Sequence, residues 1–531
     1  MKTTGTGRNG RRSRQIGGIA CAALLAGAVA LPVAAQQPAF EVHEATIAEM
    51  RAALRAGHVT ARQLVDAYLA RIEAYDRQGP SLNAIIVVHP RARAIADSLD
   101  ALFARTNEFV GPLHGIPIIV KDNYDTFDLP TTAGSAALSD SLPPRDATMV
   151  AKLRAAGAIV IAKSNMAEFA FSPVETIGSA LPGYTFNPYA LNRVPAGSSG
   201  GTAAAVAASF GAAGLGTDTG NSIRGPSSHT ALVGIRPTIG LTSRAGIVPL
   251  FLERDVGGPM ARTVADAALL LDVLAGQDER DAATANAAAH IPPTYTAALD
   301  ANALNGARIG VARRIAHREG ADAEVLARFE EALGALRAAG AIIVDPLELP
   351  FMDSVRPRLC SGFRRDLEAY LATRGDAAPF RTLDAILESG RYHRSVEQRM
   401  RSALTDSTAG SAERCGAADS SVAAFYAGLR GVLEAHRLDA IAYPTWSNPP
   451  RLVGDLTTPA GDNSQTPVPA AGVPAVTVPM GWVRGGTLPT GLQLLGDRWS
   501  ETRLIALAYA YEQATRHRRP PALTPPLERR E

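Results

Sequence analysis

Residues 196–226 read AGSSGGTAAAVAASFGAAGLGTDTGNSIRGP, and they hold two glycine-rich loops separated by an apolar segment. Glycine is concentrated where a backbone must turn sharply or approach a ligand closely. Between the loops, the residue pattern predicts a short helix over residues 202–210 and a strand over residues 213–216. Because a helix followed by a strand reverses the chain, we expect the two serine-containing loops to be neighbours in space.

The second loop, residues 218–222, ends on a serine that is a candidate nucleophile. Successive backbone N–H groups in such a turn converge on one point, where they can bind a developing oxyanion. Ser222 would therefore lie beside its own oxyanion hole. Its hydroxyl is a weak nucleophile until a neighbouring base removes the proton.

The base is predicted to be a lysine rather than a histidine. Ten histidines are scattered along the chain, and only His229 lies close to a glycine-rich loop. Lys121 ends the apolar segment GIPIIVKDN (residues 115–123), where desolvation would lower the pKa of the amine and let it accept a proton. Lys163 is the competing lysine, and we expect it to have a structural role.

Outside the loops, apolar strands alternate with amphipathic helices along most of the chain. Strands are predicted over residues 83–88, 116–120, 159–162, 307–311, 341–344, 439–443 and 475–478. Helices are predicted over residues 92–103, 147–155, 323–338 and 501–515. Two more are expected between His43 and Tyr75, separated by Gly57, with Thr60 as the N-cap of the second. This alternation predicts an α/β fold with helices over a largely parallel sheet.

Residues 352–428 differ from the rest of the chain because they are mostly polar and helical in pattern. They contain Cys360 and Cys415, a number of cysteines that excludes a cysteine-rich metal site. Whether these two form a disulfide depends on a distance that the sequence does not contain. We interpret the segment as a variable cap or insertion within a single domain over residues 36–531.

Residues 1–35 have the pattern of a secretory signal peptide. Five basic residues precede an apolar run over residues 16–35, and the small residues Val33 and Ala35 suit cleavage before Gln36. A membrane anchor is the alternative, because the run approaches the roughly 20 residues that span a bilayer. Cleavage would export the mature protein to the periplasm or the cell exterior, without stable membrane association.

The charge balance excludes one class of partner. The whole chain has 53 basic and 51 acidic residues, and loss of the leader leaves 48 basic and 51 acidic residues, a net charge of about −3. A chain with this charge balance lacks the excess of basic residues that is typical of nucleic-acid-binding proteins. We therefore expect a small-molecule partner and no nucleic acid.

The segments GIPIIVKDN, AGSSGG and GTDTGNSIRGP resemble, in order and spacing, the amidase signature family. Further likeness lies in TTAGS (residues 131–135), AKSNMAEFAF (162–171) and GVPAVTVPMGW (472–482), so the resemblance covers nearly the whole mature chain. It implies the amidase signature fold, a large mixed twisted sheet sandwiched between helical layers.

Carried over residue by residue, the resemblance implies a Ser-Ser-Lys triad. Lys121 matches the base, Ser198 the bridging serine held in a cis peptide, and Ser222 the nucleophile. The backbone N–H groups that match the oxyanion hole are those of Thr219, Gly220, Asn221 and Ser222. Ser199, Asp218 and Arg224 are expected to support the site, the last two as an ion pair that braces the loop.

Two positions depart from the common pattern of that family. Ala196 stands where glycine is usual, and Asn221 replaces the second glycine before the nucleophile. Because asparagine tolerates a positive φ better than most residues, we expect the turn to be kept. We also expect the Asn221 side chain to narrow the acyl pocket.

The implied activity is hydrolysis of the carboxamide bonds of small molecules by a secreted enzyme, through an acyl-enzyme at Ser222. This chemistry needs no metal and no organic cofactor. The identity of the amide and the oligomeric state are left open.

Two alternatives are weighed beside this interpretation. Residues 197–201 also spell G-x-S-x-G with Ser199 at the centre, which would suit an α/β-hydrolase esterase using a late histidine such as His436 or His517. The other alternative is a non-catalytic protein, either an amide-binding or an amidotransferase-like subunit, the latter working on charged transfer RNA. The predicted export argues against that role.

Overall fold

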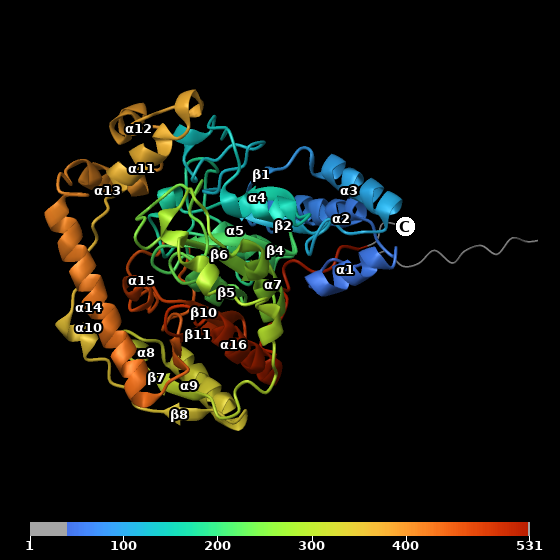
Figure 1. Ribbon diagram of the computed structural model, residues 1–531. Helices are drawn as coiled ribbons and strands as arrows, with labels where there is room; N and C mark the ends of the chain where they lie inside the picture. Colours follow the sequence, from blue (N-terminus) through green and yellow to red (C-terminus); the bar gives the residue numbers. More distant parts are fainter. Residues whose placement is uncertain (1–39, 529–531) are drawn as a thin grey trace, which may run out of the picture. The chain divides into compact units, whose positions relative to one another are not determined.

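The computed structural model describes residues 40–528, and within them eleven strands form one sheet (Figure 1). In chain order the strands are β1 (Ile85–Val88), β2 (Pro117–Lys121), β3 (Ile159–Ser164), β4 (Ala213–Asp218), β5 (Val233–Arg236), β6 (Val256–Ala261), β7 (Arg308–Val311), β8 (Ile342–Val344), β9 (Ala440–Pro444), β10 (Ala475–Val483) and β11 (Leu488–Leu495). Across the sheet they follow the order β1-β3-β2-β4-β6-β5-β10-β11-β9-β7-β8.

The sheet is mixed, which confirms what the resemblance implied and corrects the largely parallel sheet that the alternation of strands and helices predicted. Strand β2 pairs in parallel with β3 and β4, and β7 pairs in parallel with β8 and β9, whereas the pairs through the centre are antiparallel. Strands β10 and β11 form a hairpin whose turn contains Arg484, Gly485 and Gly486, all at positive φ. Such a hairpin needs no crossover helix, so it is antiparallel.

Helices surround this sheet. They are α1 (Ile47–Arg55), α2 (Ala61–Ile72), α3 (Ala92–Thr106), α4 (Thr148–Ala155), α5 (Gly200–Ala207), α6 (Arg224–His229), α7 (Val264–Leu274), α8 (Arg313–Ala316), α9 (Ala323–Ala338), α10 (Phe351–Ser354), α11 (Phe363–Ala372), α12 (Leu383–Ser389), α13 (Arg394–Leu404), α14 (Ala412–His436), α15 (Val468–Ala471) and α16 (Glu501–Thr515). Helices α9 and α16 have the predicted limits. The predicted N-cap is also confirmed, because Thr60 and Gln63 form a capping box at the start of α2.

The helical layers place the functional loops at one region of the sheet. Helix α5 packs against β2 and β4, and α6 packs against β5, β10 and β11, while α7, α9 and α16 form a second group that contacts β6 and β10. Strands β2 and β4 are buried along their whole length, which is typical of central strands covered on both faces. Buried strands and packed helices therefore surround the three parts of the site, which are the end of β2, the start of α5 and the turn between β4 and α6.

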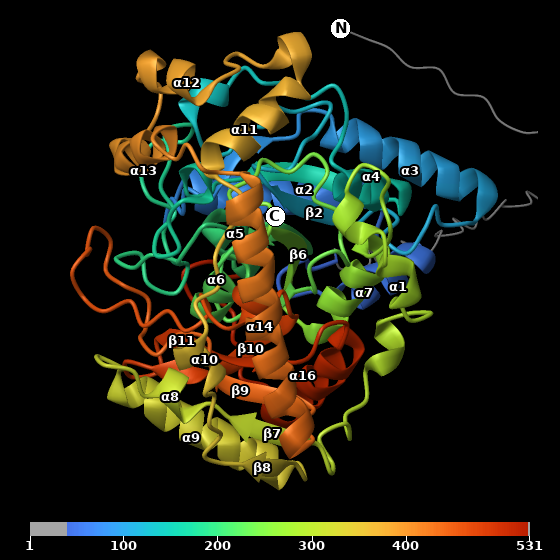
Figure 2. The ribbon, with the colours of Figure 1, turned by 60° about the vertical axis from the view of Figure 1, so that its left-hand side comes forward.

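The segment over residues 352–428 is helical, as predicted. Figures 1 and 2 show α11, α12 and α13 grouped together, with α14 running as a long rod toward β7 and β9. Phe363, Leu367 and Met400 of this group share an apolar cluster with Phe169 and Phe171. A disulfide joins Cys360 to Cys415, which answers the question that the sequence left open.

The predicted signal peptide, residues 1–35, lies outside the described residues. Within residues 40–528, none of the helices combines the length and the apolar character needed to cross a membrane. The assignment of residues 36–531 to a single domain with a variable cap stays a prediction.

Candidate active site

Lys121, the last residue of β2, is completely buried and lies at the centre of the site. Its Nζ donates hydrogen bonds to Ser198 Oγ and to Thr217 Oγ1, each at 2.7 Å. Burial lowers the pKa of Lys121 to about 7, although the negative charges of Asp218 and Asp255 act in the opposite direction. An amine with this pKa is neutral in a large fraction of molecules near neutral pH, so it can accept a proton.

The first serine loop lies directly against this lysine. Ser198 follows Gly197 through a cis peptide bond, as the resemblance implied, and the loop continues into α5. Ser199 Oγ donates to the backbone oxygen of Thr217 at 3.2 Å, at the end of β4. The predicted proximity of the two serine loops is therefore confirmed, since Thr217 contacts the first loop and lies five residues before Ser222.

Ser222 lies in the turn between β4 and α6, with 5% of its surface exposed. The carboxylate of Asp218 accepts the backbone N–H of Ile223 at 3.1 Å and that of Arg224 at 3.4 Å, which holds the start of α6. The backbone N–H groups of Thr219 to Ser222 donate to no loop or side-chain acceptor within residues 40–528. Unused donors at a buried turn suit the binding of an oxyanion.

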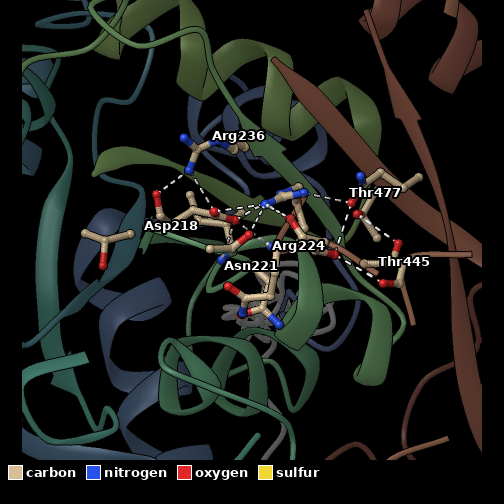
Figure 3. A network of polar contacts seen from close by, with 12 residues as sticks. Asp218, Asn221, Arg224, Arg236, Thr445 and Thr477 are labelled. Atoms are coloured by element: carbon tan, nitrogen blue, oxygen red, sulfur yellow. Dashed lines mark hydrogen bonds and ion pairs between the residues drawn. The ribbon is translucent and has the colours of Figure 1, made fainter. Parts of the chain in front are cut away.

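A buried network of charges braces this turn (Figure 3). Arg224 Nε lies 3.1 Å from one oxygen of Asp218, and Arg236 Nη1 lies 2.8 Å from the other. Burial acts to raise the pKa of Asp218, but the two guanidinium groups and their hydrogen bonds hold that pKa below its usual range. The expected ion pair of Asp218 and Arg224 is confirmed. Arg236 on β5 was missed, because nothing near it in the sequence marks it as a partner.

Asn221 behaves differently from the expectation. Its φ is not positive, and its side-chain Nδ2 donates to Oδ2 of Asp462, a residue that lines the cavity, at 2.8 Å. The residue at positive φ is Ala196, at +66°. The position at positive φ therefore lies in the first serine loop, and the expected narrowing of the acyl pocket by Asn221 stays a prediction.

Ser198 Oγ accepts a hydrogen bond from Lys121 Nζ. Within residues 40–528, no hydrogen bond joins Ser198 Oγ to Ser222 Oγ. Catalytic hydrogen bonds often tighten only when substrate is bound.

Within residues 40–528, no histidine hydrogen-bonds Ser198, Ser199 or Ser222. Ser199 Oγ is instead hydrogen-bonded to the backbone oxygen of Thr217, so the described residues give the esterase alternative no support.

Two other candidate groups, Lys163 and His229, are also buried. Lys163 Nζ lies 3.2 Å from Asp122 Oδ1 and donates to the backbone oxygen of Tyr124 at 2.8 Å, so the expected structural role is confirmed. His229 is buried, and burial lowers its pKa to about 3. In the part of the chain that the structure describes, no three His, Cys, Asp or Glu side chains are grouped to hold a metal ion.

A cavity of about 550 Å³ opens above Ser222. Thr219, Gly220 and Ser222 form part of its wall, which places the candidate nucleophile and its loop in contact with a ligand-sized space. The apolar part of the lining comes from Ala170, Phe171, Pro173, Val174, Leu250, Phe251, Leu359, Pro459 and Ala460. The charged part comes from Arg254, Arg318, Glu319, Arg399 and Asp462.

Comparison with known proteins agrees with this geometry. Residues 63–505 match the Amidase family model. A glutamyl-tRNA(Gln) amidotransferase subunit from Halorhodospira halophila is 38% identical over 493 residues, which cover 89% of this chain and 98% of that one. A probable amidase of Arabidopsis thaliana is 35% identical over 504 residues, 91% of this chain and 92% of that one.

The solved structures include the native peptide amidase of Stenotrophomonas maltophilia, with a TM-score of 0.80 and 37% identity over 90% of this chain and 99% of that one. Fold, site and matches together define a hydrolase that acts on C–N amide bonds. The chain belongs to the amidase signature family.

Proposed function

We propose that this protein is an exported amidase that cleaves small-molecule carboxamides through an acyl-enzyme on Ser222, with Ser198 as proton relay and Lys121 as base. The observation that carries the proposal is the 2.7 Å contact between Lys121 Nζ and Ser198 Oγ in a completely buried setting. A solvated lysine would stay charged at neutral pH, whereas burial brings the pKa of this one to about 7.

Acylation begins when neutral Lys121 takes a proton from Ser198 while Ser198 takes one from Ser222. Ser222 Oγ then forms a bond to the carbonyl carbon, and the negative charge moves to the carbonyl oxygen. The unused N–H groups of Thr219, Gly220, Asn221 and Ser222 stabilise that oxygen. The proton returns through Ser198 to the amide nitrogen as the C–N bond breaks, and the amine leaves.

Deacylation repeats these steps with water in place of Ser222. Water gives a proton to the relay and attacks the acyl carbon, and the proton returns to Ser222 as the ester bond breaks. The products are a carboxylate and an amine or ammonia. Every proton transfer uses a residue of the chain, so the scheme needs no metal and no organic cofactor.

The size of the cavity supports a small-molecule substrate, and the leader supports export. A volume of about 550 Å³ is in the range of small-molecule sites. A signal peptide over residues 1–35 would take the mature enzyme to the periplasm or the cell exterior. The likeness to a peptide amidase supports amides of peptide-like size.

An amidotransferase-like subunit is the second candidate, because the amidotransferase subunit of Halorhodospira halophila aligns over 98% of its length. A subunit of that kind would work with partner proteins on transfer RNA. The expected export and the net charge of about −3 after loss of the leader favour the free amidase.

The test is hydrolysis of aryl amides, peptide amides, esters and carbamates by the isolated wild-type protein and by the Ser222→Ala, Lys121→Ala and His436→Ala variants. We expect turnover that the first two changes abolish and the third leaves intact. Activity that survives Ser222→Ala would contradict the nucleophile. Turnover that requires the addition of amidotransferase partner proteins would favour the second candidate.

Export has a separate test. The full chain is expressed in a Gram-negative host, and the soluble periplasmic protein is analysed by mass spectrometry. A chain that begins at Gln36 supports cleavage and export. Retention of the intact chain in the cytoplasm or the membrane would contradict them.

A further inference from the structure

The cavity above Ser222 carries three guanidinium groups that form no ion pair with a carboxylate among residues 40–528. Arg318 Nη1 donates to the backbone oxygen of Asp462 at 2.6 Å, and Arg399 donates to the backbone oxygen of Phe171. These two arginines are exposed at the rim, whereas Arg254 is half-buried and its side chain has no hydrogen bond to any described residue.

The position of Arg254 relative to the oxyanion loop is set by its backbone. Arg254 N–H donates to the oxygen of Phe251 at 2.9 Å, and its own oxygen accepts from Arg236 Nη2 at 2.9 Å. The next residue, Asp255, accepts a hydrogen bond from Thr219 Oγ1. The turn that carries Arg254 is therefore tied both to the charge network of β5 and to the loop of Ser222.

Glu253, which precedes Arg254 in the chain, and Asp462, which lines the same cavity, both accept hydrogen bonds from other residues. Glu253 accepts the backbone N–H of Cys360 at 2.6 Å and that of Ser361 at 3.0 Å. Asp462 accepts from Asn221 at 2.8 Å, and burial raises the pKa of its carboxyl group. Both carboxylates thus accept hydrogen bonds from loops, and neither forms an ion pair with Arg254, although the charge of Glu253 acts to raise the pKa of the guanidinium group.

A half-buried charge without a partner is unusual, because removal from water is offset only by a counter-charge or hydrogen bonds. Burial lowers the pKa of Arg254, but a guanidinium group stays protonated at any physiological pH. The remaining acid of the cavity, Glu319, is exposed at the rim. A carboxylate bound in the cavity could therefore supply the counter-charge and the hydrogen bonds that Arg254 does not receive from the described residues.

We propose that Arg254 is a specificity-determining residue that binds a carboxylate of the substrate, so that the preferred substrates are amides that also carry a carboxylate. This inference rests on the proposed function of the same site. Arginine binds carboxylates through two parallel N–H···O bonds, which adds orientation as well as affinity. A carboxylate held there would orient the scissile amide toward the oxyanion loop.

The carboxylate can belong to the acyl part or to the amine part of the substrate, and two pairs of compounds distinguish these cases. Succinyl-p-nitroanilide is compared with the uncharged butyryl-p-nitroanilide, and 4-acetamidobenzoate with 4-methylacetanilide. We expect the wild type to favour the charged member of one pair by about 10- to 100-fold in kcat/KM, the range of a charge-assisted hydrogen bond.

The variants test whether Arg254 causes that preference. Arg254→Gln is expected to reduce the charged-to-neutral ratio of kcat/KM by about 10-fold or more. Arg254→Lys keeps the positive charge and is expected to retain part of the wild-type ratio. Arg105→Gln is the matched control, because Arg105 is exposed on α3 and should leave the ratio unchanged. A wild type that hydrolyses both members equally, or a ratio that Arg254→Gln does not alter, overturns the inference.

A binding experiment separates this inference from the proposed function. Calorimetric titration of the Ser222→Ala protein with succinate needs no turnover, and we expect binding that weakens about 10-fold in the Ser222→Ala, Arg254→Gln protein. If no amide is hydrolysed but this difference is seen, the proposed function fails and the carboxylate site stands. If amides are hydrolysed but succinate binding is absent or independent of Arg254, the inference is overturned.

Discussion

Thr219 Oγ1 lies 2.5 Å from Asp255 Oδ1, so the first residue of the oxyanion loop is tied to the wall of the substrate cavity. The other oxygen of Asp255 accepts the backbone N–H groups of Leu250 and Phe251, which line that cavity. One carboxyl group thus holds both the groups that would stabilise the oxyanion and the surface that would receive the substrate.

Asp255→Asn is therefore expected to lower kcat/KM by about 10-fold, because an amide can replace only part of these hydrogen bonds and a loosened donor loses transition-state stabilisation. The change also removes a negative charge that raises the pKa of Lys121, so the acid limb of the pH profile should move to lower pH. Steady-state kinetics across pH measures both effects. An unchanged profile together with unchanged kcat/KM would contradict this role.

The activity of the wild type is expected to rise with pH through about 7. Lys121 must be neutral to accept a proton, and burial lowers its pKa to about 7, so protonation removes the base as the pH falls below that value. The pH dependence of kcat/KM for a non-ionisable aryl amide measures this limb. A limb near pH 10 would mean that the lysine titrates as it does in water.

Lys121→Met is expected to abolish activity and to raise the free energy of unfolding at neutral pH. The folded-state pKa of Lys121 lies below its unfolded value, so the unfolded chain binds the extra proton between the two pKa values and burial of this lysine costs stability there. The advantage of methionine should shrink as the pH rises from about 7 toward about 10. Urea unfolding at several pH values checks this, and a gain that is constant with pH would disprove the explanation.

Asp218→Asn is expected to lower the free energy of unfolding by about 3–5 kcal/mol, because it leaves Arg224 and Arg236 buried without their counter-charge. The control is Glu434→Gln, which breaks the exposed pair with Arg430 on α14 and should cost less than about 0.5 kcal/mol. Chemical denaturation of the two variants measures the difference. Equal effects would show that the Asp218 network contributes no more than a surface pair.

Patterns of neighbouring residues in the sequence were sufficient to predict many of the helices and strands of this fold. Helices α9 and α16 have the limits that their apolar periodicity predicts, and the capping box at Thr60 involves residues three apart. Strand β6 was missed, because its sequence VGGPMA holds two glycines and a proline and gains its strand conformation only from its neighbours in the sheet. Strand β5 was also missed, and its sequence VGIR is only four residues long. The alternation of strands and helices therefore predicted a largely parallel sheet, and only the family resemblance implied the mixed one.

The sequence by itself pointed to the catalytic residues that we propose, since Lys121, Ser198 and Ser222 lie in contiguous motifs, and the resemblance of these motifs to the amidase signature family implied the role of Ser198. Only the tertiary structure identified the partners of those motifs: Arg236 beside Asp218, Asp255 beside Thr219, and Asp462 beside Asn221. These pairs join residues 18 to 241 positions apart. A charge or a hydrogen bond acts over a few ångströms, so its partner is decided by packing and leaves no mark on the residues next to it in the chain.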